Sequence, residues 1–581
     1  MGRSTATATA TRPASTSPRT TPRTEPRPKE GYRDTVEALV VAFILALVVR
    51  GFEAQAFVIP TGSMAPTLMG RHKEIACPQC GFVYAVNASE EVETRPDSQA
   101  VYSGVCVNCR YQTRLDDAPS FKGDRILVMM FPYDLPFLPG GGPPQRWDVV
   151  VFRYPEEPEV SYIKRLVGLP GETIKIVHGD IYVRQPGSQT FTLARKPLRH
   201  QSAMQIAVYD DRYRPRALDG RPEWRRWRSE SGWTAHDAST PGYRVAAPSR
   251  EAWSELRYHH LVPDPEQWDA LLSERPLPHP PRATLVTDFY SYNTNMGARS
   301  SDLVTDPPLA PEGAWMQPHW VGDLTVSTHL EIQEVAPAGS VRLELVKAGV
   351  AHRCTIELES GRATFTRGEQ VLGHRDTPVK GPGRYQVEFA NVDDRLMLVV
   401  NGRAVEPEGL VYETGDAIPI PTAADLAPAA IAVRNASVVA SDLVLKRDIY
   451  YTQDPGLIDY GVVWEDRYPR NPTELFDFLS NPARFPNLAR LRSHEYEIGA
   501  DRFLMLGDNS PRSKDSRGWR NLDAEWDTTG RKAWEVPRQL LTGKAFYVYW
   551  PHGVPIGPDI RLSHDIRVPF RPYIERMKWI R

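Results

Sequence analysis

Two short segments carry side chains whose types could support hydrolysis by an activated hydroxyl group. The first, FVIPTGSMAPTL (57–68), places Ser63 on a Thr-Gly-Ser turn, and the second, SYIKRLVGLPGE (161–172), places Lys164 in an apolar, strand-like run. A serine hydroxyl is a weak nucleophile until a base removes its proton. A lysine can act as that base when burial lowers its pKa and leaves the amine neutral. Ser63 and Lys164 are therefore a candidate catalytic pair.

A third segment, LGDNSPRSKDSRGW (506–519), is rich in polar side chains and lies far downstream. No Gly-x-Ser-x-Gly motif surrounds any serine, and the 14 histidines stand in no recognisable triad context. The three segments, in this order behind an apolar N-terminal run, resemble those of bacterial signal peptidase I, a membrane-bound protease that uses a Ser/Lys dyad.

The resemblance implies a role for each matching residue. Ser63 would attack the scissile carbonyl, and Lys164 would take its proton and later activate the deacylating water. The backbone N–H of Ser63 and the hydroxyl of Thr61 would hold the oxyanion. In the third segment, Gly507, Asp508 and Asn509 would line the site, Ser513 would orient the Lys164 amine through a hydrogen bond, and Asp515 and Arg517 would form a supporting ion pair. Asp124 also falls in a family motif, without a clear chemical role. No cofactor is implied for catalysis.

The N-terminal region predicts a membrane anchor. Residues 1–34 are rich in Thr, Ser, Pro and Arg, which predicts a disordered tail. The apolar run that follows predicts a transmembrane helix over 35–56, and the basic tail places the N-terminus in the cytoplasm and the catalytic part outside. The resemblance implies a single-pass protein of the bacterial cytoplasmic membrane. Ala54-Gln55-Ala56 also fits a cleavable signal peptide, which stays open as an alternative.

Residues 71–120 contain four of the five cysteines as two Cys-x-x-Cys pairs, Cys77/Cys80 and Cys106/Cys109. This spacing is typical of a zinc ribbon, in which two turns supply four thiolates to one structural zinc ion. Two disulfides are the alternative, since an extracytoplasmic location permits them.

Residues 196–455 alternate apolar and polar side chains in several short runs, which predicts a β-sandwich. The run GRYQVEFANVDDRLMLVVNGR (383–403) resembles the late hairpin of laminin-G-like and concanavalin-type jelly rolls. Cys354 alternates with Ile356 and Leu358 and is predicted to be a buried strand residue. Three tryptophans, Trp224, Trp227 and Trp233, fit either a carbohydrate-stacking surface or ordinary packing. We expect this insertion to be looped out of the core with its ends close together.

These observations predict a mainly β fold class. It combines the N-terminal transmembrane helix, a signal-peptidase/LexA-like β catalytic core (57–70, 121–195 and 456–581), the inserted zinc ribbon and the inserted jelly roll. The formal net charge is −2, and no basic block accompanies aromatic residues in the folded part, so nucleic acid is excluded as a partner.

The resemblance implies a serine endopeptidase that removes signal peptides from exported preproteins by cleaving after small residues. Its partners would be these preproteins and membrane lipid, and a carbohydrate or protein ligand of the sandwich is left open. A LexA-like self-cleaving protein would need a DNA-binding helix-turn-helix, and none is seen. The alternative from another class is a membrane-anchored carbohydrate- or protein-binding scaffold with an inactive peptidase core.

Overall fold

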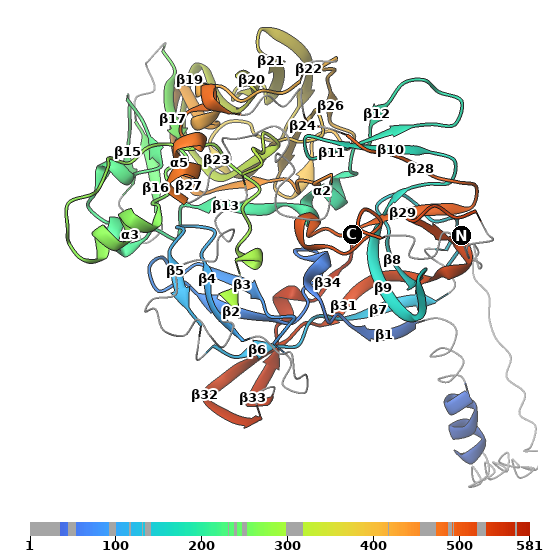
Figure 1. Cartoon of the computed structure of the whole chain (residues 1–581). Helices are drawn as coiled ribbons and strands as arrows, with labels where there is room; N and C mark the ends of the chain where they lie inside the picture. The colour runs from blue at the N-terminus through green and yellow to red at the C-terminus, as the bar shows by residue number, and fades with distance from the viewer. Residues whose placement is uncertain are drawn as a thin grey trace, which may run out of the picture. The chain divides into compact units, whose positions relative to one another are not determined.

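The computed structural model confirms a mainly β protein (Figure 1). It describes residues 35–44, 54–91, 100–115, 118–130, 132–133, 141–230, 232–236, 241–246, 252–294, 296–297, 318–415, 418–453, 472–485, 491, 493–519, 530–563 and 566–581. The chain divides into two compact units, Met1–Glu53 and Ala54–Arg581.

In the first unit the structure describes one helix, over residues 35–44. The predicted tail, 1–34, and residues 45–53 of the predicted anchor lie outside the described residues. Among the residues that are described, no helix combines the length and the apolar character that a membrane span needs. Residues 54–56, which we assigned to the anchor, instead begin strand β1, where Gln55 pairs with Val128.

The sheet that positions the candidate dyad has eight antiparallel strands in the order β1-β7-β31-β8-β9-β29-β30, with β34 added beside β31. Strands from the beginning, middle and end of the second unit therefore lie side by side. Their bounds are β1 (Ala54–Val58), β7 (Arg125–Met130), β8 (Val149–Tyr154), β9 (Glu157–Gly168), β29 (Arg502–Leu506), β30 (Glu535–Pro537), β31 (Leu541–Trp550) and β34 (Lys578–Trp579).

Four smaller groups of strands surround this sheet. The first is β12 (Thr192–Leu193), β11 (Asp180–Arg184), β10 (Thr173–Val177) and β28 (Glu495–Glu497). The cysteine-rich region forms β3 (Val83–Asn87), β2 (His72–Ala76) and β6 (Ser120–Phe121), and also β4 (Val101–Val105) and β5 (Gln112–Arg114), to which β18 (Met296–Gly297) is added. The last is the hairpin β32 (Gly553–Ser563) and β33 (Ile566–Pro572).

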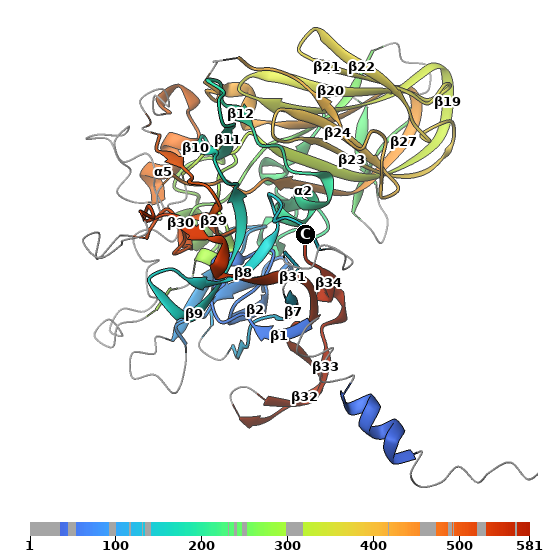
Figure 2. The ribbon, with the colours of Figure 1, turned by 90° about the vertical axis from the view of Figure 1, so that its right-hand side faces the viewer.

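The insertion forms a fourteen-stranded sheet around the long strands β19 and β27 (Figure 2). Its strands are β13 (Ile206–Asp210), β14 (Trp227–Arg228), β15 (Trp233–His236), β16 (Gly242–Val245), β17 (Ser254–Tyr258), β19 (Leu324–Lys347), β20 (Val350–Glu357), β21 (Arg362–Arg367), β22 (Gln370–Asp376), β23 (Gly383–Asn391), β24 (Arg395–Val400), β25 (Arg403–Ala404), β26 (Leu410–Val411) and β27 (Ala429–Arg447). The alternation predicted for this region is confirmed, since Leu324, Val326, Leu330 and Ile332 all point into one apolar core.

The same core tests two predictions, the burial of Cys354 and the role of the three tryptophans. Cys354 is fully buried in it, as predicted. Trp227 and Trp233 are also buried there, and Trp224 is buried in a neighbouring cluster that includes the four paired cysteines. The three tryptophans therefore pack inside the protein, and they do not form a stacking surface for carbohydrate.

The helices of the second unit are short, α2 (Leu198–Met204), α3 (Pro265–Leu272) and α5 (Pro472–Leu479). Pro472 stands at the first position of α5, where its fixed φ suits a helix start. The 3₁₀ turns are η1 (Gly62–Met64), η2 (Arg216–Leu218), η3 (Pro222–Trp224), η4 (Ser291–Asn293), η5 (Ala423–Leu426), η7 (Pro482–Arg484), η9 (Ser510–Arg512), η10 (Arg538–Leu540) and η11 (Ile574–Arg576).

The insertion shares an apolar core with the strands around it. Ile206, Ile449 and Tyr451, which lie inside the predicted insertion, pack in one cluster with Ile174 of β10 and Leu504 of β29. The predicted domain boundaries stay a prediction. The shared core means, however, that removing 196–455 would expose apolar side chains of the peptidase-like strands.

Candidate active site

Ser63 lies in the turn η1. Asp124 forms hydrogen bonds with Ile59, which precedes this turn, and with Met69, which follows it. The main-chain N–H of Ile59 donates to the Asp124 carbonyl oxygen at 2.9 Å, and that of Asp124 donates to the Met69 carbonyl at 2.8 Å. The Asp124 carboxylate accepts a further hydrogen bond from the Met69 N–H at 2.7 Å. Asp124, which had no chemical role in the sequence analysis, thus fixes both ends of the loop that presents Ser63.

Lys164 reaches Ser63 from strand β9, where it pairs with Val150 of β8. Its Nζ donates to Ser63 Oγ at 2.8 Å and to the carbonyl oxygen of Ile163 at 3.0 Å. Ser63 is 7% exposed and Lys164 is 4% exposed. The structure therefore brings the two candidate residues, 101 positions apart, into direct contact in a site that excludes most water.

Burial controls the protonation of Lys164. Desolvation disfavours the charged amine and lowers its pKa from 10.5 to about 8. The carboxylates of Asp515 and Asp508 oppose this shift, and the guanidinium of Arg517 adds to it. An amine with a pKa of about 8 is partly neutral near neutral pH, so it can accept the proton of the serine hydroxyl.

Asp515 and Arg517 form a fully buried ion pair, with Arg517 Nη2 2.7 Å from Asp515 Oδ2. The same carboxylate oxygen accepts the main-chain N–H of Gly507 at 2.9 Å. Arg517 Nη1 donates to the Ser510 hydroxyl at 2.7 Å and to the Thr452 carbonyl at 2.6 Å. The pair thus holds the loop 507–517 in one shape. Burial also distinguishes it from a surface pair, which contributes little to stability.

A second buried ion pair, which the sequence did not predict, involves the residue next to Lys164. Arg165 donates from Nε and Nη2 to the two carboxylate oxygens of Asp508, both at 2.6 Å. Thr67, four residues after Ser63, donates its hydroxyl to Asp508 Oδ2, and Arg165 Nη1 donates to the Trp147 carbonyl. Burial works against the charge of Arg165, but the Asp508 carboxylate outweighs it and raises the pKa of the guanidinium. Asp508 therefore ties β9 to the Ser63 loop.

The remaining predicted residues lie close to the Ser63 turn. The Asn509 main-chain N–H donates to the Ser63 carbonyl at 3.0 Å, and its side-chain Nδ2 donates to the Gly62 carbonyl at 3.2 Å. Gly507 has no room for a side chain, because a Cβ there would lie 2.2 Å from Ser513 Oγ and 2.5 Å from the Ser63 carbonyl oxygen.

One expected interaction is not formed. Ser513 Oγ is buried and has no hydrogen-bond partner within the part of the chain that the structure describes, so the expected bond to the Lys164 amine is not made. Lys164 Nζ is directed instead at Ser63 Oγ and its own strand. Thr61 is exposed and precedes the turn in extended conformation, and its hydroxyl does not cap the turn. The predicted oxyanion role of Thr61 stays a prediction.

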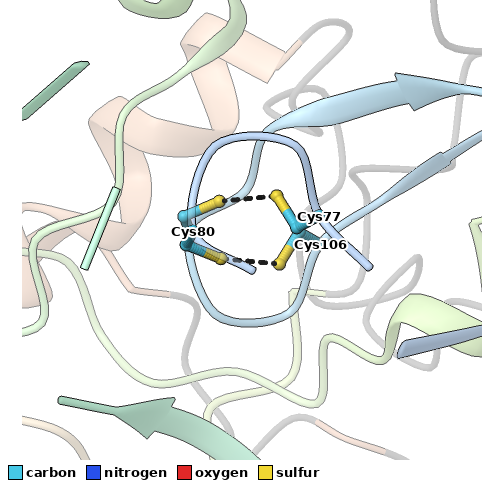
Figure 3. A group of neighbouring side chains, drawn as sticks. Cys77, Cys80 and Cys106 are labelled. Carbon is cyan, nitrogen blue, oxygen red and sulfur yellow. Dashed lines mark hydrogen bonds between the residues drawn. The ribbon is translucent and has the colours of Figure 1, made fainter. Parts of the chain in front are cut away.

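The four paired cysteines lie together at the ends of two hairpins (Figure 3). Cys77 and Cys80 lie in the turn between β2 and β3, and Cys106 and Cys109 lie in the turn between β4 and β5. The Sγ atoms of Cys77 and Cys109 are 3.6 Å apart, and those of Cys80 and Cys106 are 3.7 Å apart. Four sulfurs around one tetrahedral zinc ion would be separated by about 3.8 Å, so this arrangement could bind a metal.

Comparison with known proteins places this chain beside the signal peptidases. The family model "Signal peptidase, peptidase S26" matches residues 110–216. Signal peptidase I of Pseudomonas aeruginosa is 56% identical over 59 residues, which cover 9% of this chain and 21% of that protein. Signal peptidase I of Rickettsia typhi is 30% identical over 139 residues, covering 24% of this chain and 38% of that protein. The resemblance to signal peptidase I is confirmed, and the chain spans less than two fifths of the length of these relatives.

Two solved structures are similar to larger parts of the chain. A carbohydrate-binding module from Bacillus subtilis is 10% identical, with a TM-score of 0.22, and covers 38% of this chain and 94% of its own. A protein of unknown function with a galectin-like fold, also from Bacillus subtilis, is 9% identical, with a TM-score of 0.23, and covers 42% and 96%. TM-scores this low establish neither a fold nor a ligand.

The Arg165–Asp508 pair gives a test of what holds the site together. Arg165→Met would leave the Asp508 carboxylate buried without its partner, so we expect the free energy of unfolding to fall by about 3–5 kcal/mol. Arg375→Met is a matched control, because Arg375 pairs with Glu406 at 2.8 Å where the side chains are 36% and 33% exposed. It should cost less than about 1 kcal/mol. Denaturant titration of both variants measures the difference, and equal costs would contradict the assignment of Arg165 as a buried tie.

Proposed function

We propose that this protein is a membrane-bound serine endopeptidase of the signal peptidase I type, with Ser63 as nucleophile and Lys164 as general base. The observation that carries the proposal is the distance of 2.8 Å between Lys164 Nζ and Ser63 Oγ in a buried site. Desolvation gives the amine the protonation behaviour that a base needs. The similarity to signal peptidase I over the segment that contains Lys164 supports the same assignment.

The reaction follows from these two groups. The neutral Lys164 amine takes the Ser63 proton as Oγ attacks the scissile carbonyl carbon, and the resulting ammonium ion then gives that proton to the departing amine. A bond forms between Ser63 Oγ and the acyl carbon while the peptide C–N bond breaks. The neutral amine next removes a proton from water, which attacks the acyl-enzyme, and the proton returns to Ser63 Oγ. The Ser63 N–H and the Thr61 hydroxyl stabilise the oxyanion in both steps.

The substrates in this proposal are exported preproteins, cleaved after small side chains. Shallow pockets that admit only alanine-sized groups would provide this selectivity. The segment 35–53 anchors the protein in the cytoplasmic membrane and places the site on the outer face, where signal peptides emerge. Preproteins and membrane lipid are then the partners.

The four-cysteine module would hold one structural zinc ion in this proposal. The Sγ–Sγ distances of 3.6 and 3.7 Å fit the edge of a zinc–thiolate tetrahedron. In each turn the residue after the second cysteine adopts positive φ, Gly81 at 76° and Arg110 at 64°. The ion would cross-link the two hairpins and take no part in the peptidase reaction, which needs no cofactor.

A second candidate function is binding of a carbohydrate or protein ligand by the insertion. A cleft of about 780 Å³ lies between the hairpin β10–β11 and the insertion, and its lining includes Tyr182, Phe191 and Tyr412. A cleft of this size fits a small ligand. In this candidate the sandwich and cleft belong to a membrane-anchored scaffold, and the Ser63–Lys164 contact is the feature that it leaves unexplained.

Substitution of the dyad tests the proposed peptidase. Ser63→Ala and Lys164→Ala should each lower kcat for a model preprotein by about 10⁴-fold or more, and the double variant should be no worse, since the two groups act as a unit. The assay uses detergent-solubilised full-length protein. Ser188→Ala and Lys544→Ala are controls. Ser188 lies in an exposed turn, and Lys544, which lies on strand β31, forms an ion pair with Asp148 and not with Ser63. Substantial preprotein cleavage by the Lys164→Ala variant would exclude Lys164 as the general base.

Metal analysis tests the four-cysteine module. The purified protein should contain about one zinc ion per chain, and Cys77→Ser should lose it and lower the melting temperature. The paired thiols should resist alkylation until a chelator is added. Cys354→Ser is the control, because Cys354 lies in the sandwich core and should leave the zinc content unchanged. Metal-free protein in which Cys354 is the single free thiol after denaturation would favour two disulfides instead.

A further inference from the structure

The turn η4 of the insertion packs directly against the turn that carries Ser63. Tyr292 is fully buried, and Asn293 is 2% exposed. A Cβ atom on Gly62 would lie 2.2 Å from Tyr292 Cε1, so the tyrosine ring fills the space above Gly62. The nucleophile's turn is therefore covered by a residue more than 200 positions downstream, from a region that the related proteases' motifs do not include.

Asn293 extends this contact into a chain of hydrogen bonds that ends at Ser63. Its side-chain Nδ2 donates to Asn509 Oδ1 at 2.8 Å, and Asn509 Nδ2 donates back to Asn293 Oδ1 at 2.8 Å. Asn509 Nδ2 also donates to the Gly62 carbonyl, which fixes the direction of its amide. The Asn509 main-chain N–H then donates to the Ser63 carbonyl. Asn293 thereby determines how the Asn509 amide is placed against the nucleophile's turn.

The position of Asn293 is itself fixed by the cysteine-rich region. The Thr294 hydroxyl donates to the Ser291 carbonyl at 2.7 Å and accepts from the Val105 main-chain N–H at 2.9 Å. Directly after the turn, β18 pairs with β4, with Met296 opposite Ser103. The turn is thus held by β4 as well as by Asn509, so it can act as a fixed support.

A small cavity shows that the insertion also backs the rest of this loop. About 20 Å³ remains between insertion residues, among them Tyr290 and Arg447, and the loop residues Asp508, Asn509 and Ser510. The insertion therefore lies next to the whole loop 508–510 and not to Asn509 alone.

We propose that Asn293 is a positioning residue for the Ser63 reaction, and that the insertion therefore completes the active site. This inference rests on the proposed peptidase function. The side-chain hydrogen bonds of Asn293 go to Asn509 and not to Ser63 or Lys164, so it acts through Asn509. It holds Asn509, which holds the Gly62 and Ser63 carbonyls and so aims the Ser63 N–H at the oxyanion. Loss of that aim affects the transition state more than substrate binding, so the effect falls on kcat and leaves KM nearly unchanged.

The test compares Asn293→Ala with Asn391→Ala in detergent-solubilised full-length protein. Asn391 is a matched control because it is an asparagine of the same insertion, is fully buried and accepts a hydrogen bond from Tyr412 at 2.7 Å, away from Ser63. Two readouts are measured, the kcat and KM of preprotein cleavage and the hydrogen–deuterium exchange of the peptide covering 57–70. The milder variant Asn293→Ser is read in the same way if Asn293→Ala does not fold.

We expect Asn293→Ala to lower kcat by about 10- to 100-fold with KM unchanged within about twofold, as small displacements of reacting groups do. Exchange in 57–70 should become faster, while Asn391→Ala leaves both readouts at wild-type values. Equal behaviour of the two variants in both readouts would overturn the inference. If the wild type itself cleaves no preprotein, the proposed function fails, and unchanged exchange in Asn293→Ala would then overturn the positioning role separately.

Discussion

The structure depends on excluding water from the Lys164 amine where it contacts the Ser63 hydroxyl. Lys164 Nζ lies 2.8 Å from Ser63 Oγ, and burial lowers the pKa of that amine to about 8. A solvated lysine would remain protonated at neutral pH and could not accept a proton. The strand, the loop and the ion pairs around the dyad therefore have one common requirement, to hold the two groups together while excluding water.

Strand β9 meets this requirement through two consecutive residues. Successive side chains on a strand point to opposite faces, so Lys164 faces Ser63 while Arg165 binds Asp508 behind it. Asp508 also accepts from Thr67, on the loop that carries Ser63. The loop 507–517 is in turn held by the buried Asp515–Arg517 pair. Charges buried in this way are costly unless every partner is present, which links the stability of the loop to the geometry of the dyad.

The sequence predicts local structure here better than long-range contacts. The run 383–403 predicts a hairpin and forms β23 and β24, and Cys354 is buried in a strand as predicted, because alternation and turn signals are local properties. The apolar neighbours of Lys164 correctly indicated its burial. The predicted anchor, in contrast, includes residues 54–56, where pairing with β7 produces a strand.

The missed residues have partners hundreds of positions away. Arg165 and Asp508 are 343 positions apart, and Asn293 and Asn509 are 216 positions apart. Such long separations follow no helical or strand periodicity, so the sequence pattern does not reveal these contacts. For Arg165, the one indication of a buried partner was a charged side chain within an apolar strand. The Ser513–Lys164 hydrogen bond was expected from the resemblance and is not formed. A motif shared with related proteins identifies the residue but does not determine the direction of its side chain.

The most direct test of the central claim is the titration of Lys164 itself. Nuclear magnetic resonance of the protein with isotopically methyl-labelled lysine amines, with the Lys164 signal assigned by its loss in Lys164→Arg, would measure its pKa without reference to any substrate. We predict a pKa of about 8 for Lys164 and a displaced Lys164 signal in Ser63→Ala. A pKa near the ordinary value of 10.5 would contradict it, because the amine would then be solvated and the buried dyad would not exist in solution.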